Sequence, residues 1–178
     1  MTIFLSGGAK NGKSSLAQEL AVRLAAGGPL YYVATMIPVD DEDRERIRRH
    51  VADRAGMGFQ TLECGRSVLS CLDRTDRDGT FLLDSVTALL MNEMFSASGV
   101  DPAAGERCAA DLASFIRSVK HAVVVSDAIY SDGERYDGIT EQYRAALGLA
   151  DRACAAACDT AIEMTAGMPV IFKGVLPE

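Results

Sequence analysis

The chain lacks any long hydrophobic segment, although 48% of its residues are hydrophobic. No apolar run approaches the roughly 18 residues that a membrane-spanning helix requires, so we expect no contact with a membrane. The first apolar run is only Ile3 to Leu5, and no basic segment precedes it as in a secretory signal. We therefore expect a cytoplasmic protein.

The chain also lacks an excess of positive charge, and its formal net charge is −7. A general nucleic-acid binder needs a basic face with interleaved aromatic side chains, and the sequence contains no such cluster of lysine and arginine. We therefore expect no nucleic-acid partner and a small-molecule ligand instead.

Cysteine pairs of the C-x-x-C type are absent, and the five cysteines make an odd count. In a cytosolic enzyme such cysteines are usually small buried residues. Cys154 and Cys158 lie one helical turn apart without a nearby histidine, so their spacing does not favour a metal site. Internal repeats and low-complexity segments are absent too, and a length of 178 residues indicates one domain over residues 1–178.

The main feature that is present is a glycine-rich loop between a short strand, residues 2–6, and an amphipathic helix, residues 15–24. Its pattern, G-x-x-x-x-G-K-S, is that of a phosphate-binding P-loop, and in this context a chance glycine-rich turn is the weaker interpretation. The glycines let several backbone N–H groups point into one concavity, and the helix start adds unpaired N–H groups. We expect nucleotide contacts from Gly7, Gly8, Ala9, Lys10, Asn11, Gly12, Lys13, Ser14 and Ser15.

Side chains of the loop and of a later strand complete a phosphoryl-transfer site. Lys13 supplies a cation for the β- and γ-phosphates of a nucleotide, and the Ser14 hydroxyl supplies a ligand for Mg²⁺. The apolar strand at residues 80–85 ends in Asp84, whose carboxylate is placed to steady the same Mg²⁺. Asp84 has an alternative role as the N-cap of the next helix, and the two roles are compatible.

The order of the predicted elements defines the fold class. The first strand, its helix and a second strand at residues 30–34 form a βαβ unit, which implies parallel pairing. We predict an α/β P-loop NTPase domain with a mostly parallel, RecA-like sheet flanked by helices and a C-terminal antiparallel hairpin. The remaining predicted strands are residues 59–63, 80–85, 121–126, 159–165 and 168–173, the remaining predicted helices are 40–54, 66–72, 86–95, 103–118 and 140–158, and 98–102 is a predicted linker.

The predicted helix at residues 40–54 is charged on most faces, which indicates a solvated or subunit-facing element. Glu42, Arg46 and His50 follow one another at i, i+4 spacing along one stripe, and Arg49 lies beside them. Arginines would hold an anionic ligand against the histidine. From spacing alone, a surface histidine in a charged helix is the favoured interpretation.

The predicted strand at residues 121–126 separates two further candidates. Asp127 follows the carboxyl end of this strand and should face the crevice in which α/β sheets bind ligands. His121 opens the strand at the opposite end, so we interpret it as structural. Residues 129–138 are polar and lack a periodic pattern, which is typical of a substrate loop or lid.

Several segments match one family pattern at the family's spacing. Residues 7–14 fit G-G-x-x-S-G-K-S, with Asn11 in place of the usual serine. The pattern Y-I-A-T…D-x-E…R-I-x-x-H is matched by residues 32–35, residues 40–42, Arg46-Ile47 and His50. The pattern W-x-T-x-E is matched by Phe59, Thr61 and Glu63, and the pattern L-L-D-C-L-T…N by residues 82–87 with Asn92. The closing pattern G-x-P…K-G is matched by residues 167–169 with Lys173-Gly174. Nearly the whole chain thus resembles the bifunctional adenosylcobinamide kinase / adenosylcobinamide-phosphate guanylyltransferase family of cobalamin biosynthesis.

The resemblance implies two reactions. A nucleoside triphosphate, ATP or GTP, with Mg²⁺ phosphorylates adenosylcobinamide, and GMP from GTP is then transferred to adenosylcobinamide phosphate. It reverses the interpretation of His50, which matches the histidine that carries GMP as a covalent phosphoramidate. It further implies nucleotide contacts from Thr35, Arg46, Arg49 and Glu63, and assembly as a homo-oligomer, a trimer in this family.

The second half of the chain departs from the family pattern. Asp127 and Ala128 stand where the family has Asn and Glu, and Asp151 and Arg152 stand where it has Asn and Gln. Two alternatives therefore remain open. One is a P-loop kinase of another small alcohol or nucleotide in which His50 is inert, and the other is a non-catalytic nucleotide-binding homologue.

Overall fold

The structure is a computed structural model that describes residues 1–97, 99–130 and 133–177. The strands are β1 (Thr2–Gly7), β2 (Leu30–Ala34), β3 (Gln60–Glu63), β4 (Thr80–Asp84), β5 (Phe95–Ser96), β6 (Gly99–Val100), β7 (His121–Val125), β8 (Thr160–Thr165) and β9 (Met168–Lys173). The helices are α1 (Lys13–Ala25), α2 (Asp41–Asp53), α3 (Val86–Met94), α4 (Ala104–Ser118) and α5 (Gly138–Ala157), with a short 3-10 helix, η1 (Val68–Arg74).

Seven strands form one sheet in the order β3-β2-β4-β7-β1-β8-β9. All neighbouring pairs are parallel except β8 and β9, which form the C-terminal antiparallel hairpin. The strand β7 lies between the loop-bearing strand β1 and the acid-bearing strand β4, so both of its neighbours end in a candidate functional segment. The predicted mostly parallel sheet with a closing hairpin is confirmed.

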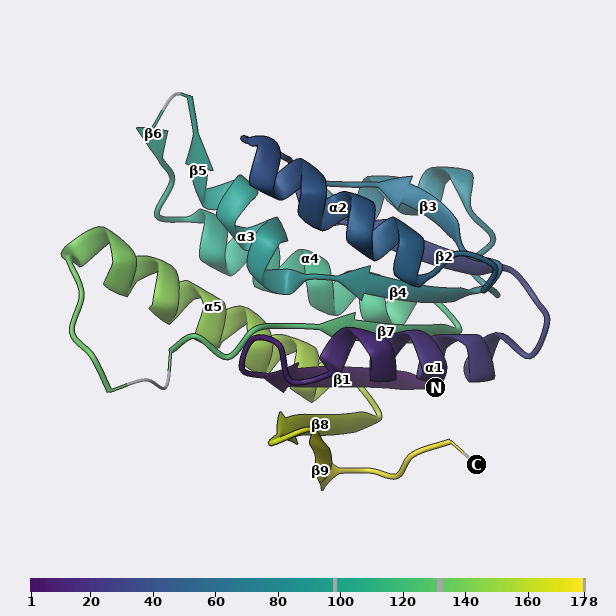
Figure 1. Ribbon diagram of the computed structural model, residues 1–178. Coiled ribbons are helices and arrows are strands. Elements are labelled where there is room, and N and C mark those ends of the chain that lie inside the picture. The colour runs from purple at the N-terminus through teal and green to yellow at the C-terminus, as the bar shows by residue number, and fades with distance from the viewer. Residues whose placement is uncertain (98, 131–132, 178) are drawn as a thin grey trace.

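Two layers of helices cover the sheet (Figure 1). Side chains alternate along β1, so Ile3 and Leu5 pack with α1 while Phe4 packs with α3, α4 and α5 on the opposite face. The same alternation puts Leu82 on the α1 face of β4. Asp84, two residues further along β4, therefore lies at the carboxyl edge on the α1 face.

The alanine-rich helix α5 packs closely against α4. At Gly105 of α4 an added Cβ atom would lie 2.7 Å from the Cβ atom of Ala146, so only glycine allows this approach. The small residues of α5 thus serve helix-to-helix packing, which extends the core on one side of the sheet. All five cysteines are free and buried, as expected.

Most predicted elements are confirmed with small shifts of their ends, and two segments differ. The short helix predicted at residues 66–72 is the 3-10 helix η1. The linker predicted at residues 98–102 includes β6, which pairs with β5 in a small antiparallel ribbon; residue 98 itself lies outside the described residues. Among the helices described, none has the length and apolar character to cross a membrane.

Candidate active site

The P-loop connects β1 to α1, and its backbone geometry restricts two of its positions to glycine. Gly7 has a φ of 142°, and an added Cβ atom would lie 2.6 Å from the carbonyl oxygen of Met164 on β8. Gly12 has a φ of 88° and precedes the first residue of α1 without a side-chain cap on the helix. Gly12 thus offers no side-chain acceptor to the N–H groups that follow in the first turn of α1, and such N–H groups can bind a phosphate.

Asn11 fastens the loop to the neighbouring strand β8. Its side-chain nitrogen donates to the carbonyl oxygen of Met164 at 2.7 Å, and its side-chain oxygen lies 3.4 Å from both the backbone nitrogen and Nζ of Lys13. Lys13 is 6% exposed, and its Nζ donates to the carbonyl oxygen of Gly8 at 2.6 Å. The substitution of Asn for the usual serine thus gives the loop a tie to β8 that the sequence did not reveal.

The carboxylate of Asp84 lies at the tip of β4, and Ser85 is the N-cap of α3. The Ser85 hydroxyl accepts from the backbone nitrogen of Ala88, so the alternative that Asp84 caps this helix is wrong. The Tyr32 hydroxyl donates to Asp84 Oδ2 at 2.8 Å. Burial, followed by the charge of Asp84, raises the pKa of Tyr32, so this hydroxyl stays protonated and remains a donor.

The donors at this edge of the sheet fit Mg²⁺ held partly by a nucleotide. Mg²⁺ usually takes one or two protein oxygens together with substrate phosphates and water, rather than a cage made only of protein. Among the described residues no group of three or more His, Cys, Asp or Glu side chains could hold a metal ion alone. Within the described part of the chain the hydrogen bond from Tyr32 goes to Oδ2 of Asp84, so Oδ1 would be the oxygen that holds a Mg²⁺ ion shared with the phosphates.

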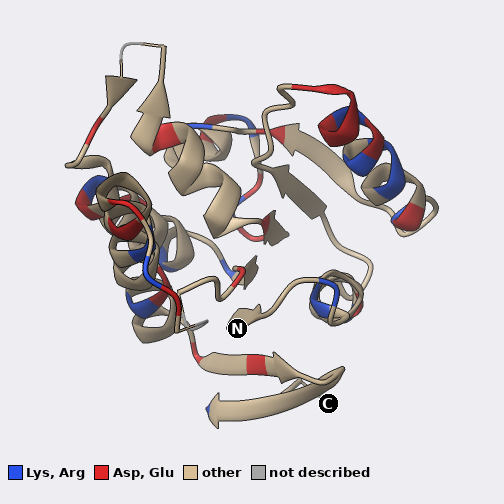
Figure 2. Cartoon of the chain, turned by 60° about the vertical axis from the view of Figure 1, so that its left-hand side comes forward, with Lys and Arg blue, Asp and Glu red and all other residues tan. Residues whose placement is uncertain are grey.

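The helix α2 differs from the other helices because it has no buried residue. Asp40 caps it by accepting from the backbone nitrogen of Asp43, and three acidic residues in the first turn favour the positive end of the helix dipole. Charged side chains cover it on most sides (Figure 2). The expectation that this helix stays out of the core is confirmed.

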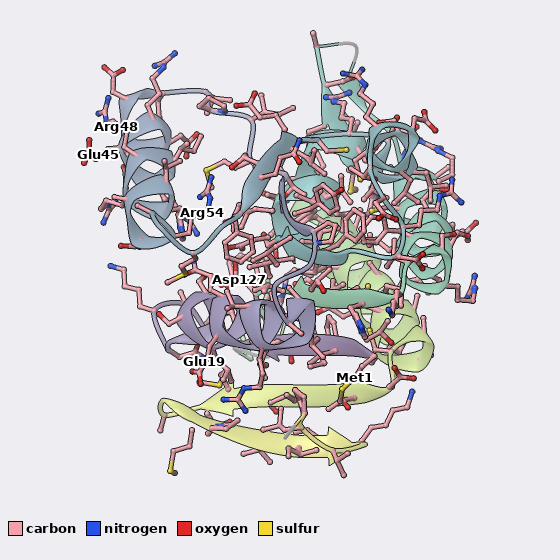
Figure 3. All side chains as sticks on the ribbon, turned by 90° about the vertical axis from the view of Figure 1, so that its right-hand side faces the viewer. Met1, Glu19, Glu45, Arg48, Arg54 and Asp127 are labelled. Carbon is pink, nitrogen blue, oxygen red and sulfur yellow. The ribbon has the colours of Figure 1, made fainter. Side chains whose placement is uncertain are left out.

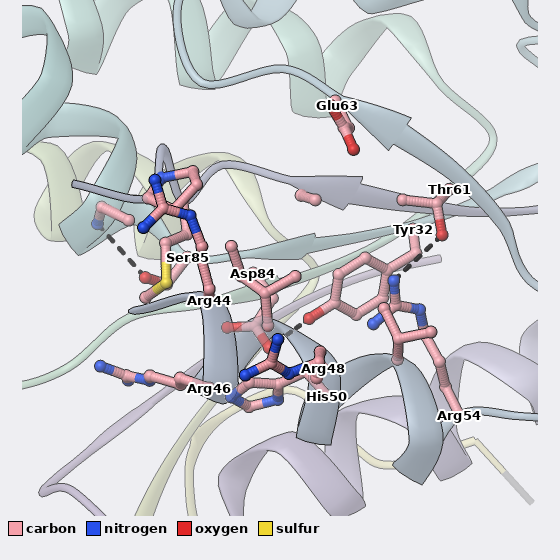
Figure 4. A pocket seen from close by; sticks show the side chains of 16 residues that line it. Tyr32, Arg44, Arg46, Arg48, His50, Arg54, Thr61, Glu63, Asp84 and Ser85 are labelled. Carbon is pink, nitrogen blue, oxygen red and sulfur yellow. Dashed lines mark hydrogen bonds between the residues drawn. The ribbon is translucent and has the colours of Figure 1, made fainter. Parts of the chain in front are cut away.

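A cavity of about 490 Å³ lies between α2 and the ends of β2, β3 and β4. Figure 4 shows the side chains on its wall, with His50 and Arg46 from α2 and Asp84 from β4. The lining residues are Tyr32, Ala34, Met36, Pro38, Arg44, Arg46, Ile47, Arg48, His50, Val51, Arg54, Thr61, Glu63, Asp84, Ser85 and Ala88.

Four arginines and two carboxylates line the cavity, in a chain whose net charge is −7. Arg44 and Arg48 form exposed ion pairs with Asp41 and Glu45 of α2, so within the described residues Arg46 and Arg54 are the lining arginines without an ion pair. Arg54 lies on the side of α2 that faces the sheet (Figure 3). Its guanidinium lies 4.0 Å from the centre of the Tyr32 ring and donates to the Thr61 hydroxyl at 3.0 Å. The arrangement suits an anionic ligand such as a nucleotide phosphate.

His50 is half-buried on the wall of this cavity, so it is not the plain surface histidine that its spacing favours. Its Nδ1 atom is buried, and it has no hydrogen-bond partner within the part of the chain that the structure describes. A buried ring nitrogen without a protein partner, next to several guanidinium groups, fits the contact of an imidazole with a bound anion.

The structure brings together some of the predicted residues and separates others. Arg46 and Glu63 line the cavity with His50, whereas Arg49 is exposed and is not among the lining residues. Thr35 is fully buried, and its hydroxyl accepts from the Ser85 nitrogen at 2.6 Å and donates to the Ser85 carbonyl at 2.8 Å. Thr35 thus joins the tips of β2 and β4 instead of facing a ligand.

The phosphate loop and the cavity are adjacent but distinct. None of residues 7–15 lines the cavity, although the loop and Asp84 lie on the same face and at the same edge of the sheet. The Asp84 carboxylate borders the cavity and is two strands away from the loop-bearing strand β1. Asp84 thus borders the cavity at the edge of the sheet that also carries the loop.

Most cavity residues lie outside the set of nucleotide contacts expected from the sequence, among them Tyr32, Arg44, Arg48 and Arg54. Arg54 falls four residues after His50, so it continues the stripe of Glu42, Arg46 and His50 by one turn. This periodicity could have predicted its place beside His50. Tyr32 is a buried core residue of β2. It opens the segment that matches Y-I-A-T, but its apolar surroundings in the sequence gave no sign of its contact with Asp84. His121 Nδ1 lies 2.8 Å from the amino nitrogen of Met1, at the edge of the sheet opposite the site, as its interpretation as a structural residue expects.

The fold and the loop together define the class, a P-loop NTPase domain. A solved structure described as an ATPase domain is similar over 97% of this chain and 76% of its own, with a TM-score of 0.56 and 10% identity. A protein of Pyrococcus horikoshii OT3 is similar over 98% of this chain and 86% of its own, with a TM-score of 0.51 and 8% identity. These likenesses establish the fold alone.

The sequence comparison then gives the family. The sequence model of the family described as "Cobinamide kinase / cobinamide phosphate guanyltransferase" matches residues 3–172, which is nearly the whole chain, and the chain belongs to this family. A search of curated proteins found no significant match.

Proposed function

We propose that this protein phosphorylates adenosylcobinamide with a nucleoside triphosphate and then transfers GMP from GTP to the product through a covalent intermediate on His50. The observation that carries the proposal is the position of His50, half-buried beside arginines in a cavity next to a P-loop. Family membership supports both activities as a class. The covalent intermediate and the particular substrates are our inference.

The first step uses the P-loop. The loop N–H groups and Lys13 bind the β- and γ-phosphates, and they are fixed before the nucleotide arrives. Ser14 and Asp84 would hold Mg²⁺, which supplies charge neutralisation at these phosphates when bound. The aminopropanol hydroxyl of adenosylcobinamide attacks the γ-phosphorus, the bond to the β-phosphate oxygen breaks, and the nucleoside diphosphate leaves with the electron pair.

The second step uses the cavity. A ring nitrogen of His50 attacks the α-phosphorus of GTP, an N–P bond forms, and pyrophosphate leaves. A phosphate oxygen of adenosylcobinamide phosphate then attacks the same phosphorus, and the N–P bond breaks. Two phosphates repel each other and are poor nucleophiles, so a histidine intermediate divides a difficult transfer into two easier ones. Arg44, Arg46, Arg48 and Arg54 would neutralise the phosphate charges in this cavity.

The edge strand β9 supports the further proposal of a homo-oligomer. Every residue of β9 is exposed, and its apolar side chains include Met168 at 66% and Phe172 at 70% exposure. An uncovered apolar edge strand is a favourable surface for pairing with another chain. We expect light scattering to give a multiple of 19.0 kDa and Phe172→Lys to lower it; a monomeric wild-type protein at micromolar concentration contradicts the proposal.

Product analysis tests the function directly. Purified protein is incubated with adenosylcobinamide and either ATP or GTP, and the products are identified by mass spectrometry. We expect the phosphate ester with ATP and the GDP ester with GTP, so each half-reaction is reported separately. Formation of the phosphate ester alone favours a kinase with an inert His50, and nucleotide binding without either product favours a non-catalytic homologue.

A further inference from the structure

The P-loop lysine forms an ion pair with a carboxylate that belongs to neither the loop nor the His50 cavity. Lys13 Nζ lies 2.9 Å from Asp127 Oδ1, and the two side chains are 6% and 25% exposed. Figure 3 shows Asp127 beside α1. A nucleotide phosphate that binds Lys13 must therefore lie next to this carboxylate.

The backbone on both sides of this carboxylate is fixed. The Asp127 nitrogen donates to the Thr87 hydroxyl at 2.9 Å, and the Ala128 nitrogen donates to the carbonyl oxygen of Gly7 at 3.1 Å. These two bonds connect the segment after β7 to α3 on one side and to the start of the P-loop on the other. Asp127 is thus held between the phosphate loop and the strand that carries Asp84.

A second carboxyl group, that of Asp151, contacts the segment that follows β7. Asp151 of α5 is 3% exposed, and its Oδ2 accepts from the Tyr130 hydroxyl at 2.9 Å. Burial raises the pKa of Asp151 to about 6, with a smaller contribution from the charge of Asp127, against lowering by the Ser126 and Tyr130 hydroxyls. Ser126 Oγ and Asp151 Oδ1 nevertheless have no hydrogen bond of good geometry within the described residues. Burial thus disfavours a charged Asp151 beside Asp127.

We propose that Asp127 is a catalytic residue of the phosphoryl-transfer step, and that its carboxylate orients the acceptor hydroxyl at the γ-phosphate and takes its proton. This rests on the proposed function, because it assumes that the P-loop nucleotide donates its γ-phosphoryl group to a hydroxyl. The hydroxyl oxygen forms a bond to the γ-phosphorus, the bond to the leaving diphosphate breaks, and the hydroxyl proton passes to Asp127 and then to solvent. Enzymes that transfer phosphoryl groups to hydroxyls commonly use an aspartate in this way.

Other carboxylates near the loop fit this role less well. Asp84 already accepts from Tyr32 and is the candidate Mg²⁺ ligand. Asp151 is almost fully buried behind Tyr130. Asp127 combines contact with the P-loop lysine and access to solvent, which proton transfer from a substrate requires.

The test is Asp127→Asn, which keeps the shape of the side chain and the backbone bonds but cannot take a proton. It installs the Asn of the family pattern while Ala128 still stands in place of the family Glu, so the variant has neither carboxylate at this strand end. We expect γ-phosphoryl transfer at saturating ATP or GTP to fall by about 10²- to 10⁴-fold, with nucleotide affinity unchanged or higher because a negative charge beside the phosphates is removed. Asp127→Glu should recover part of the activity. Asp78→Asn, in an exposed turn, is the matched control.

The outcomes separate this inference from the proposed function. Transfer by Asp127→Asn at the wild-type rate, or loss of transfer together with loss of nucleotide affinity, would show that Asp127 only holds Lys13. If the wild-type protein does not phosphorylate adenosylcobinamide, the proposed function is wrong. The hydrolysis of ATP or GTP, with water as the acceptor, then decides the inference: a fall in Asp127→Asn supports it and an unchanged rate overturns it.

Discussion

The P-loop and the helix α2 face the same side of the sheet, yet they are held in different ways. The loop is tied to β8 through Asn11, and its lysine is almost fully buried. The helix α2 has no buried residue and spans a cavity, and the buried Arg54 just after its end contacts Tyr32 and Thr61. The comparison indicates a preformed phosphate site at the loop. Beside it lies a cavity with one wall formed by α2, a helix that makes few contacts with the sheet.

This difference also explains what the sequence could predict. Phosphate binding by the loop depends on consecutive backbone groups and one lysine, so a local pattern was enough to find it. The cavity is built from side chains of α2, β2, β3 and β4, and no single segment contains it. The charge and exposure of α2 were predicted, but its spacing alone favoured a surface position for His50.

Polar residues at the strand ends were the least predictable part of the site. Both Asp84 and Ser85 are common N-cap residues, and only the backbone decides that Ser85 caps α3. Thr35 matches the family pattern but bonds Ser85 instead of facing the cavity. The contact of Asp127 with Lys13 joins residues 114 positions apart in the chain, so it required the pairing of β7 with β1.

The largest expected effect comes from removing the positive charge of Lys13 at the P-loop. Lys13→Ala removes the only side-chain cation that we place on the β- and γ-phosphates and leaves Asp127 unpaired beside them. Charge-assisted hydrogen bonds are worth about 1.5 to 3 kcal/mol, so we expect nucleotide affinity to fall by roughly 100-fold and γ-transfer to become undetectable. Isothermal titration and product assays measure both, with the exposed Lys120→Ala as control. Unchanged kinase activity would contradict the assignment.

A second variant tests how lightly α2 is attached. Arg54→Met keeps the apolar stem but removes the contacts with the Tyr32 ring and the Thr61 hydroxyl. We expect faster hydrogen exchange throughout α2 and roughly tenfold less labelling of His50 by GTP, with little change in ATP affinity at the loop. Arg23→Met on the exposed side of α1 is the control. Equal exchange in the two variants would mean that other contacts hold α2.

The smallest effect on activity is expected at Asp151, whose ionisation acts on stability instead. The pKa of Asp151 rises from 3.8 to about 6 on folding, so the folded chain binds this proton more tightly than the unfolded chain. Its destabilising effect is therefore absent below about pH 4, grows between pH 4 and 6, and is complete above that range, where it is on the order of 3 kcal/mol.

Asp151→Asn should consequently raise the thermal midpoint at pH 8 and change it little at pH 4.5. Thermal unfolding followed by circular dichroism at the two pH values measures this, with Asp78→Asn as the exposed control. An equal shift at both pH values would mean that packing, and not ionisation, determines the effect of this residue.

The central claim, that His50 carries GMP, has one most direct measurement. The protein is incubated with GTP labelled at the α-phosphate, denatured and tested for covalent label that is lost in acid and stable in base, as expected of a phosphoramidate. Wild type and His121→Ala, which changes the only other histidine at the opposite edge of the sheet, should be labelled, and His50→Ala should not. Persistent label in His50→Ala, or none in the wild type, would contradict the account.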